Sequence, residues 1–144
     1  MSYVKIWLHG VWGTKNRNSI LSENIHDNVC LHIRSNAAKN DIFIDTIDGG
    51  SDHLHSLMTL SANMTVSKQM QLIKGESSYW INKNRLINGR FEWGDRYFVE
   101  SISANQVERV RAYIRCQKEH HKKTTFLDEY NAFLQKFGFP PEQG

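Results

Sequence analysis

The sequence predicts an α+β fold in which an antiparallel sheet carries helices on one face, the ferredoxin-like or split βαβ arrangement. Apolar residues alternate with a period of two in several short segments, as they do in strands. Between these segments, apolar residues recur about four positions apart, as they do in helices. The elements follow one another as β-α-β-β-α-β and then helices. The second face of the sheet is left for a ligand or for a second copy of the chain.

The first half of this order contains three strands and one helix. Residues 3–13 alternate loosely between apolar and polar side chains, which indicates a strand. After a polar loop, Ser22 is the expected N-cap of a helix. The apolar stripe of that helix has a spacing of four and consists of Leu21, Ile25, Val29, Ile33 and Ala37. Residues 41–47 and 53–60 are expected to pair as a hairpin across the turn cluster at 48–52.

The second half is predicted to be mostly helical. A helix over about 65–83 precedes an aromatic, β-branched segment at 91–101, which we interpret as a strand or bent hairpin. A capping box, formed by a serine and a glutamine three residues apart, indicates the start of a helix over about 104–121. The last helix is amphipathic, covers about 125–137, and is followed by Gly138, a residue that often terminates helices.

Length and composition indicate one ordinary globular domain. No linker, repeat or low-complexity tract divides the 144 residues, so we expect residues 1–144 to form a single domain. Hydrophobic residues make up 40% of the chain and charged residues 23%, which excludes an intrinsically disordered protein. No apolar run approaches the roughly 20 residues that a membrane span needs.

Charge and the N-terminal sequence bear on partner and location. The net charge of +3 permits a nucleic-acid partner without requiring one. The opening MSYVKIWLHG lacks the features of a signal peptide, so we expect a cytoplasmic protein. Cys30 and Cys116 do not have the spacing of metal ligands and are expected to be reduced thiols.

The segment Asp52-His53-Leu54-His55 is the first candidate for chemistry. Positions i and i+2 of a strand point to the same face, so His53 and His55 would lie side by side while Leu54 enters the core. Two imidazoles placed in this way offer a bidentate metal site. On its own, however, H-x-H is more often a pair of strand histidines that face solvent or form hydrogen bonds within the fold.

Tyr113 and Gln117 are the second candidate. They are four residues apart on a predicted helix and would therefore be neighbours on its surface. Alone, they are more typical of a tyrosine at the core edge and a solvated glutamine. A tyrosine hydroxyl, with a pKa of about 10, attacks a phosphodiester well only when the phosphate is polarised, and a divalent metal does this as a Lewis acid. Two histidines and the amide oxygen of Gln117 would hold such a metal and leave positions open for phosphate.

An H-hydrophobic-H pair on a central strand, followed by a helix with Tyr-x-x-x-Gln, resembles the single-tyrosine HUH transposases of the insertion sequence 200/605 type. REP-associated tyrosine transposases share the same core. The resemblance covers about residues 3–138 and is carried by four segments, WLHGVWGTKNRNSIL, SDHLHSLMTL, VSKQMQLIKGESSYWIN and VERVRAYIRCQKEHHKKTTFLDEYNAFLQKFGF. They are similar to that family's first strand and basic loop, metal strand, second helix, and catalytic helix with C-terminal tail.

The resemblance implies a role for each candidate. His53, His55 and Gln117 would bind a divalent metal, for which Mg²⁺ and Mn²⁺ suit phosphoryl oxygen chemistry. Tyr113 would attack a DNA phosphate, become linked to its 5′ side and release a 3′-OH, and the reverse attack would join strands. The implied partners are single-stranded DNA with hairpin ends and a second copy of the chain in a homodimer.

Three basic residues are candidates for DNA contacts. Lys15 and Arg17 lie in the loop after the first strand, and Lys74 lies on the second predicted helix. Each is also typical of an ordinary solvated charge. Three alternatives to a transposase stay open: a domesticated or REP-associated HUH nuclease, a non-catalytic ferredoxin-like module that binds nucleic acid, and a small-molecule or metal-sensing dimer.

Overall fold

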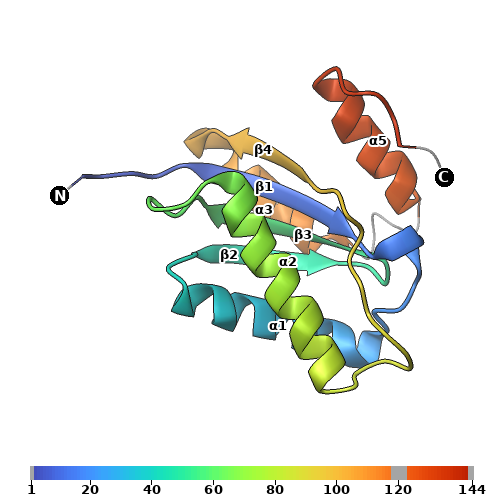
Figure 1. Ribbon diagram of the computed structural model, residues 1–144. Coiled ribbons are helices and arrows are strands. Elements are labelled where there is room, and N and C mark those ends of the chain that lie inside the picture. Colours follow the sequence, from blue (N-terminus) through green and yellow to red (C-terminus); the bar gives the residue numbers. More distant parts are fainter. Residues whose placement is uncertain (1, 118–122, 143–144) are drawn as a thin grey trace.

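The computed structural model describes residues 2–117 and 123–142, and it contains a four-stranded antiparallel sheet. In the order β2-β3-β1-β4, the strands are Ile44–Gly49, His53–Thr59, Trp7–Gly13 and Phe98–Ile102 (Figure 1). β3 pairs antiparallel with both β1 and β2, so β1 and β2 run parallel on either side of it. This is the split βαβ arrangement, and it confirms the predicted fold class.

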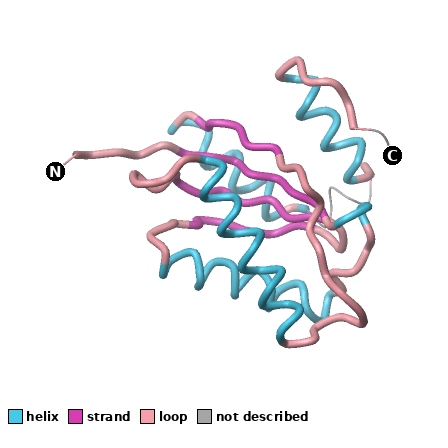
Figure 2. The backbone as a smooth tube through the Cα atoms, in the orientation of Figure 1, coloured by secondary structure: helices cyan, strands magenta, loops and turns pink. Residues whose placement is uncertain are grey.

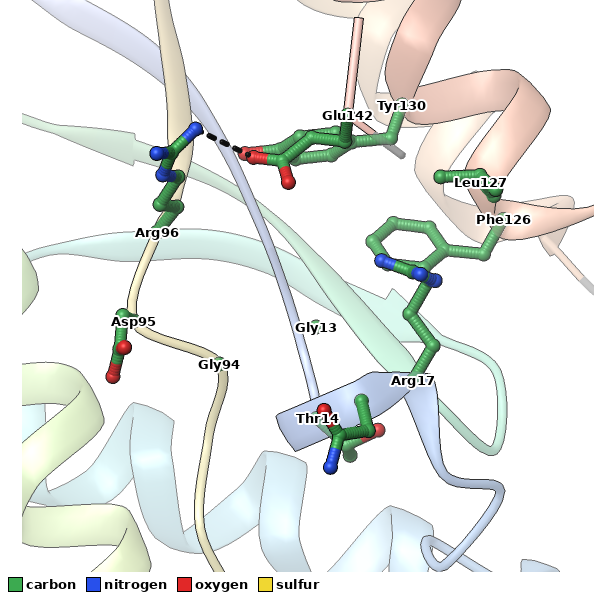
Figure 3. A pocket seen from close by; sticks show the side chains of 11 residues that line it. Gly13, Thr14, Arg17, Gly94, Asp95, Arg96, Phe126, Leu127, Tyr130 and Glu142 are labelled. Carbon is green, nitrogen blue, oxygen red and sulfur yellow. Dashed lines mark hydrogen bonds and ion pairs between the residues drawn. The ribbon is translucent and has the colours of Figure 1, made fainter. Parts of the chain in front are cut away.

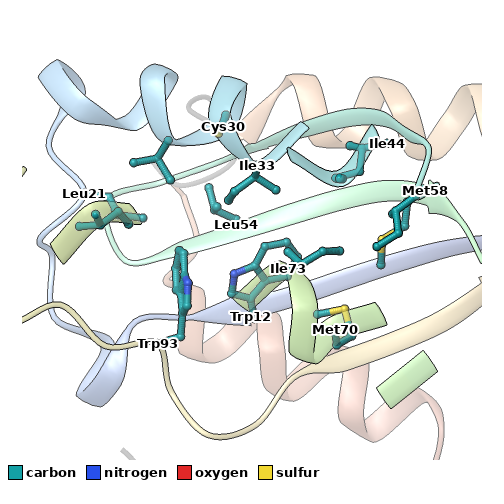
Figure 4. Packing of buried hydrophobic residues seen from close by; sticks show 14 of the residues in the cluster. Trp12, Leu21, Cys30, Ile33, Ile44, Leu54, Met58, Met70, Ile73 and Trp93 are labelled. Carbon is teal, nitrogen blue, oxygen red and sulfur yellow. The ribbon is translucent and has the colours of Figure 1, made fainter. Parts of the chain in front are cut away.

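Two helices, α1 (Glu23–Lys39) and α2 (Val66–Lys83), cover one face of the sheet. Apart from the buried Ser56, the side chains of β1 and β3 that point to this face are apolar, and they pack with the inner stripes of both helices into the main core (Figure 4). Trp12 and Leu54, from β1 and β3, are completely buried there. The alternation that predicted these strands thus determines which side chains enter the core.

The opposite face is covered by the C-terminal part of the same chain. A 3₁₀ turn at Ala104–Gln106 leads into α3 (Val107–Arg115), and α5 (Phe126–Lys136) follows. The sheet runs between α2 and α3 (Figure 2). α3 packs Val107 and Ile114 on Leu57 of β3, whereas α5 packs on Val11 and Phe98 of β1 and β4. A ligand would therefore meet this face between two helices rather than on an open sheet.

Some local predictions differ from the structure. Most of the segment predicted as a strand over 91–101 is a loop, because Phe91 and Trp93 fill the core while Asn82 binds the backbone of Phe91. Apart from an isolated antiparallel bridge between Trp93 and Thr14, strand pairing begins at Phe98. The predicted capping box does not form, since the Ser103 hydroxyl donates to the side chain of Asn105.

The predicted helix over 104–121 is interrupted in the structure by a turn at Cys116, after which Gln117 is helical again. α3 ends at Arg115, and residues 118–122 lie outside the described part of the chain. Within the described residues, no helix is both long enough and apolar enough to cross a membrane.

Candidate metal and tyrosine site

His53 and His55 lie side by side on β3, on the face that α3 and α5 cover. Both side chains are completely buried, while Leu54 between them belongs to the core on the other face. Their rings are 5.2 Å apart between centroids. The spacing of the H-x-H motif therefore places the two imidazoles together, as the sequence predicted.

The Nε2 atoms of both rings meet two side-chain oxygens, one from Gln117 and one from Glu129. The Nε2 atom of His53 lies 3.2 Å from Oε1 of Gln117, and the Nε2 atom of His55 lies 3.0 Å from Oε1 of Glu129. His53 Nε2 and the same Glu129 oxygen are 3.9 Å apart. The ligand atoms of His53, His55 and Glu129 all lie within 4.8 Å of one another, which is compact enough to surround one cation.

The Nδ1 atoms of the two histidines face acceptors on the opposite side of each ring. His53 Nδ1 lies 2.8 Å from the carboxylate of Asp52. His55 Nδ1 lies 2.9 Å from Nε2 of His9, and His9 Nδ1 lies 3.0 Å from the carboxylate of Glu100. A carboxylate only accepts hydrogen bonds, so His53 and His9 each carry a proton on Nδ1.

The available protons do not satisfy all of these contacts. Three contacts link Glu100, His9, His55 and Glu129 in a chain, but two neutral imidazoles supply only two protons. Burial lowers the pKa of His55 to about 3, so this ring is neutral at physiological pH. A neutral His53 likewise uses its one proton on Asp52 and turns a lone pair toward Gln117. The two contacts that lack a proton, from His55 to Glu129 and from His53 to Gln117, lie in the same small space. A cation bound to the lone pairs there would satisfy both.

Gln117 reaches this space by a route other than the predicted one. Because α3 ends at Arg115 and Cys116 is a turn residue, Gln117 is not one helical turn from Tyr113 on a continuous helix. Its side chain is nevertheless completely buried, and its amide Nε2 donates to the carbonyl oxygen of Tyr113 at 3.3 Å. That bond directs the amide oxygen toward His53.

Tyr113 lies beside the two histidines within the same chain. Its ring centroid is 5.7 Å from that of His55, and its hydroxyl donates to Oε2 of Glu129. Burial, together with the negative charge of Glu129, raises the pKa of Tyr113 above its ordinary value. The hydroxyl is therefore protonated at neutral pH, and its proton is already directed at a carboxylate.

The position of α3 is fixed by an ion pair to the sheet. Arg111, two residues before Tyr113 on α3, donates from Nε and a terminal nitrogen to the two oxygens of Asp45 at 2.8 and 2.9 Å. Asp45 lies on β2, the neighbour of β3. This two-point contact limits rotation of α3 relative to the strand with the histidines.

Glu129 is the functional candidate that the sequence analysis missed. Its two oxygens contact the histidines and Tyr113, so one buried carboxylate joins both halves of the site. Burial raises the pKa of Glu129, but hydrogen bonding within the site, including the bond from the Tyr113 hydroxyl, outweighs burial and lowers the pKa. A signal was present, because Glu129 interrupts the apolar stripe of α5 between Phe126 and Phe133.

The three basic candidates have different surroundings. Lys15 pairs with Glu92 at 2.9 Å, and the half-buried Lys74 donates to the carbonyl oxygen of Gly94 at 2.7 Å. Arg17 lines a pocket of about 420 Å³ between the loop after β1, the 94–96 segment and α5 (Figure 3). Phe126 also lines this pocket and stacks on His53 with 4.3 Å between ring centroids, so the pocket adjoins the histidine site.

Comparison with known proteins identifies the family. The model of the family described as "Transposase IS200 like" matches residues 2–117. The chain belongs to the IS200-like transposase family. It is accordingly a DNA transposase, as the sequence predicted. The ISDra2 transposase TnpA of Deinococcus radiodurans is 25% identical over 117 residues, which cover 77% of this chain and 83% of that relative.

Solved structures share the fold of this transposase. A crystal structure at 1.90 Å of a Deinococcus radiodurans R1 protein assigned as a transposase has a TM-score of 0.65 and 22% identity, covering 81% of this chain and 95% of that one. A REP-associated tyrosine transposase bound to a REP hairpin has a TM-score of 0.64 and 16% identity, covering 100% of this chain and 89% of that one. Both confirm the arrangement of sheet and helices.

Proposed function

We propose that this transposase cleaves and rejoins single-stranded DNA, with Tyr113 as the nucleophile and a divalent cation held by His53, His55 and Gln117. The observation that carries the proposal is the convergence of a tyrosine hydroxyl, two imidazole lone pairs, an amide oxygen and a carboxylate in one buried space. Such a set suits nucleophilic attack on a phosphodiester better than it suits binding alone.

The donor set fits a hard or borderline divalent cation such as Mg²⁺ or Mn²⁺. Glu129 adds a carboxylate oxygen to the two imidazole nitrogens and the amide oxygen, and together with a neutral amide it leaves the occupied site positively charged. When bound, the cation supplies Lewis-acid polarisation of the scissile phosphate. The proton of the nucleophile can be assigned to residues of the chain itself.

Strand cleavage begins with the oxygen of Tyr113. This oxygen attacks the scissile phosphorus, its proton passes to the Oε2 atom of Glu129, and the bond from phosphorus to the 3′ oxygen breaks. The leaving 3′ oxygen takes a proton from solvent, and the 5′ phosphate stays on Tyr113. Because the pKa of Tyr113 is raised and that of Glu129 lowered, we infer that proton transfer accompanies the attack rather than preceding it.

Rejoining is the same step in reverse. A 3′-OH gives its proton to solvent and attacks the phosphotyrosine, the new phosphodiester forms, and the Tyr113 oxygen leaves and regains its proton from Glu129. The phosphotyrosine linkage conserves the energy of the broken phosphodiester bond, so no external energy source is required. Tyr113 lies beside the histidines of its own chain, which supports cleavage in cis, and we propose that a homodimer brings two DNA ends together.

Single-stranded DNA with a hairpin end is the proposed partner. A structural neighbour is a REP-associated tyrosine transposase bound to a REP hairpin, and that class of ligand is carried over here. Of the three basic candidates, Arg17 has the strongest support because it lines the pocket beside His53. Lys15 and Lys74 would have to exchange their contacts with Glu92 and Gly94 for phosphate.

The test is a gel assay for a covalent adduct. Labelled single-stranded DNA with the terminal hairpin of the element is incubated with the protein and Mg²⁺ or Mn²⁺, alongside Tyr113→Phe, His53→Ala and a chelator control. We expect a label-bearing protein band that all three controls lose. Tyr79→Phe is the matched control, because this exposed tyrosine on α2 lies away from the site and its substitution should leave the adduct intact.

An adduct that persists in Tyr113→Phe would show that another group is the nucleophile. Tight binding of the hairpin without any adduct would instead support a non-catalytic nucleic-acid-binding module on the same fold.

A further inference from the structure

His9 and Glu100 form a buried chain behind the metal site that the proposed chemistry does not use. His9 on β1 and Glu100 on β4 are directly opposite each other in the antiparallel pair, and both point to the face of the sheet that carries His55. Their side chains are only 3% and 6% exposed. Burying an imidazole and a carboxylate is costly, so a role beyond solvation is expected for the pair.

The geometry of the chain is continuous from Glu100 to His55. Glu100 accepts from His9 Nδ1 at 3.0 Å, and His9 Nε2 faces His55 Nδ1 at 2.9 Å, with the two imidazole rings nearly parallel at 12°. Lys136 from α5 contacts the other Glu100 oxygen at 3.3 Å and helps to keep the carboxylate in place. Each polar atom along this line therefore has a specific neighbour.

We propose that Glu100 and His9 are positioning residues that fix the tautomer of His55 and so prepare its Nε2 atom for the cation. This inference rests on the proposed function, since it assumes a cation at His53 and His55. Glu100 accepts only, so a neutral His9 must carry its proton on Nδ1. The lone pair of His9 Nε2 then accepts from His55 Nδ1, and His55 must present its own lone pair on Nε2.

Without Glu100, the same series of hydrogen bonds would favour the opposite tautomer of His55. If a hydrogen-bond donor replaced that carboxylate, the proton of His9 would move to Nε2 and donate to His55 Nδ1. The proton of His55 would then lie on Nε2, where it points at Glu129 and blocks the cation. The tautomer of His53 is fixed without an intervening histidine, because Asp52 contacts its Nδ1 directly at 2.8 Å.

The first test measures Mn²⁺ affinity of the purified full chain from the free-ion EPR signal, in the absence of DNA. His9→Phe keeps a ring packed on His55 but removes both nitrogens, and Glu100→Gln presents an amide N–H to His9. We expect both to weaken Mn²⁺ binding by about 10–100-fold. His9→Gln restores an acceptor near His55 Nδ1 and should recover part of the loss.

His32→Phe is the matched control. His32 is also paired with a carboxylate, Glu76 at 2.7 Å, and also stacks on an aromatic ring, but it lies between α1 and α2. The Mn²⁺ affinity of the His32→Phe variant should equal that of the wild type. If His9→Phe and Glu100→Gln also bind Mn²⁺ as the wild type does, the positioning role is excluded.

A second measurement does not depend on whether the variants fold. In wild-type protein loaded with Zn²⁺ as a diamagnetic probe, side-chain ¹⁵N NMR should show His9 with a single proton, on Nδ1. A proton on His9 Nε2 would overturn the inference while leaving the metal site itself intact. If the wild type binds Mn²⁺ no better than His53→Ala does, the proposed metal site fails, and the inference fails with it.

Discussion

The two faces of the sheet are built from the same strands but have opposite chemistry. On β3, Leu54 and Met58 enter the main hydrophobic core under α1 and α2, whereas His53 and His55 face a buried polar space under α3 and α5. The apolar face contributes stability by removing hydrocarbon from water. The polar face buries imidazoles and carboxylates, which costs free energy unless these groups are paired. Alternation along one strand thus separates folding from function.

The largest expected effect is on the polar face. Replacing Glu129 with glutamine keeps the shape of the side chain but removes the basic carboxylate that takes up the Tyr113 proton. We expect the rate of adduct formation to fall about 100- to 10,000-fold, the usual contribution of a general base. Single-turnover cleavage of labelled hairpin DNA measures this rate. The unfolding midpoint should stay close to that of the wild type, and an unchanged rate would remove Glu129 from the mechanism.

The next largest effect is on the apolar face, at Leu54, which lies between the two histidines on β3. Leu54→Ala leaves a cavity in the main core and should lower the free energy of unfolding by about 2–5 kcal/mol. Chemical denaturation of the metal-free protein measures it. Where enough folded protein remains, Mn²⁺ affinity should be unchanged, because Leu54 faces away from the histidines. Leu54→Met is the control, with a cost below about 1.5 kcal/mol.

Binding of a cation should restore stability on the polar face. At a Mn²⁺ concentration about 100 times the dissociation constant, the folded state should gain about 2.7 kcal/mol. Thermal unfolding with increasing Mn²⁺ checks this, and the shift should disappear in His53→Ala. A shift of equal size in that variant would place the bound ion somewhere else.

The smallest effect concerns the ion pair that positions α3. The hydrogen bonds from Arg111 lower the pKa of Asp45, so its contribution to stability is present above the unfolded value of about 3.9 and is lost as pH falls through the lowered folded pKa. Because solvent screens both groups, Asp45→Asn should cost only a few tenths of a kcal/mol at neutral pH. In denaturation experiments, the difference from wild type should be largest at pH 7 and should shrink as the pH is lowered toward 3.

The face with the histidines could be predicted because its signals are local. The period of two in β3 is enough to place His53 and His55 together with Leu54 behind them, and the fold follows from the order of such patterns. Glu129 and the His9–Glu100 pair could not be found in this way. Which strand a helix covers, and which residues of three strands become diagonal neighbours, depends on tertiary packing that a linear pattern does not contain.

Gln117 illustrates the same limit within a single helix. A spacing of four predicted that it would follow Tyr113 on one helical face, yet α3 ends at Arg115. The amide still reaches His53 because it bonds the carbonyl oxygen of Tyr113 from beyond the end of the helix. The prediction of proximity holds for a different physical reason.

The location of Glu129 matters for anyone who trims or fuses this enzyme. The family match ends at residue 117, and the carboxylate that contacts Tyr113 lies on α5, outside that boundary. A version truncated after residue 117 would keep the H-x-H and Tyr-x-x-x-Gln motifs that resemble those of such enzymes. It would lack α5 and therefore Glu129, so a fusion point after α5 keeps the proposed site complete.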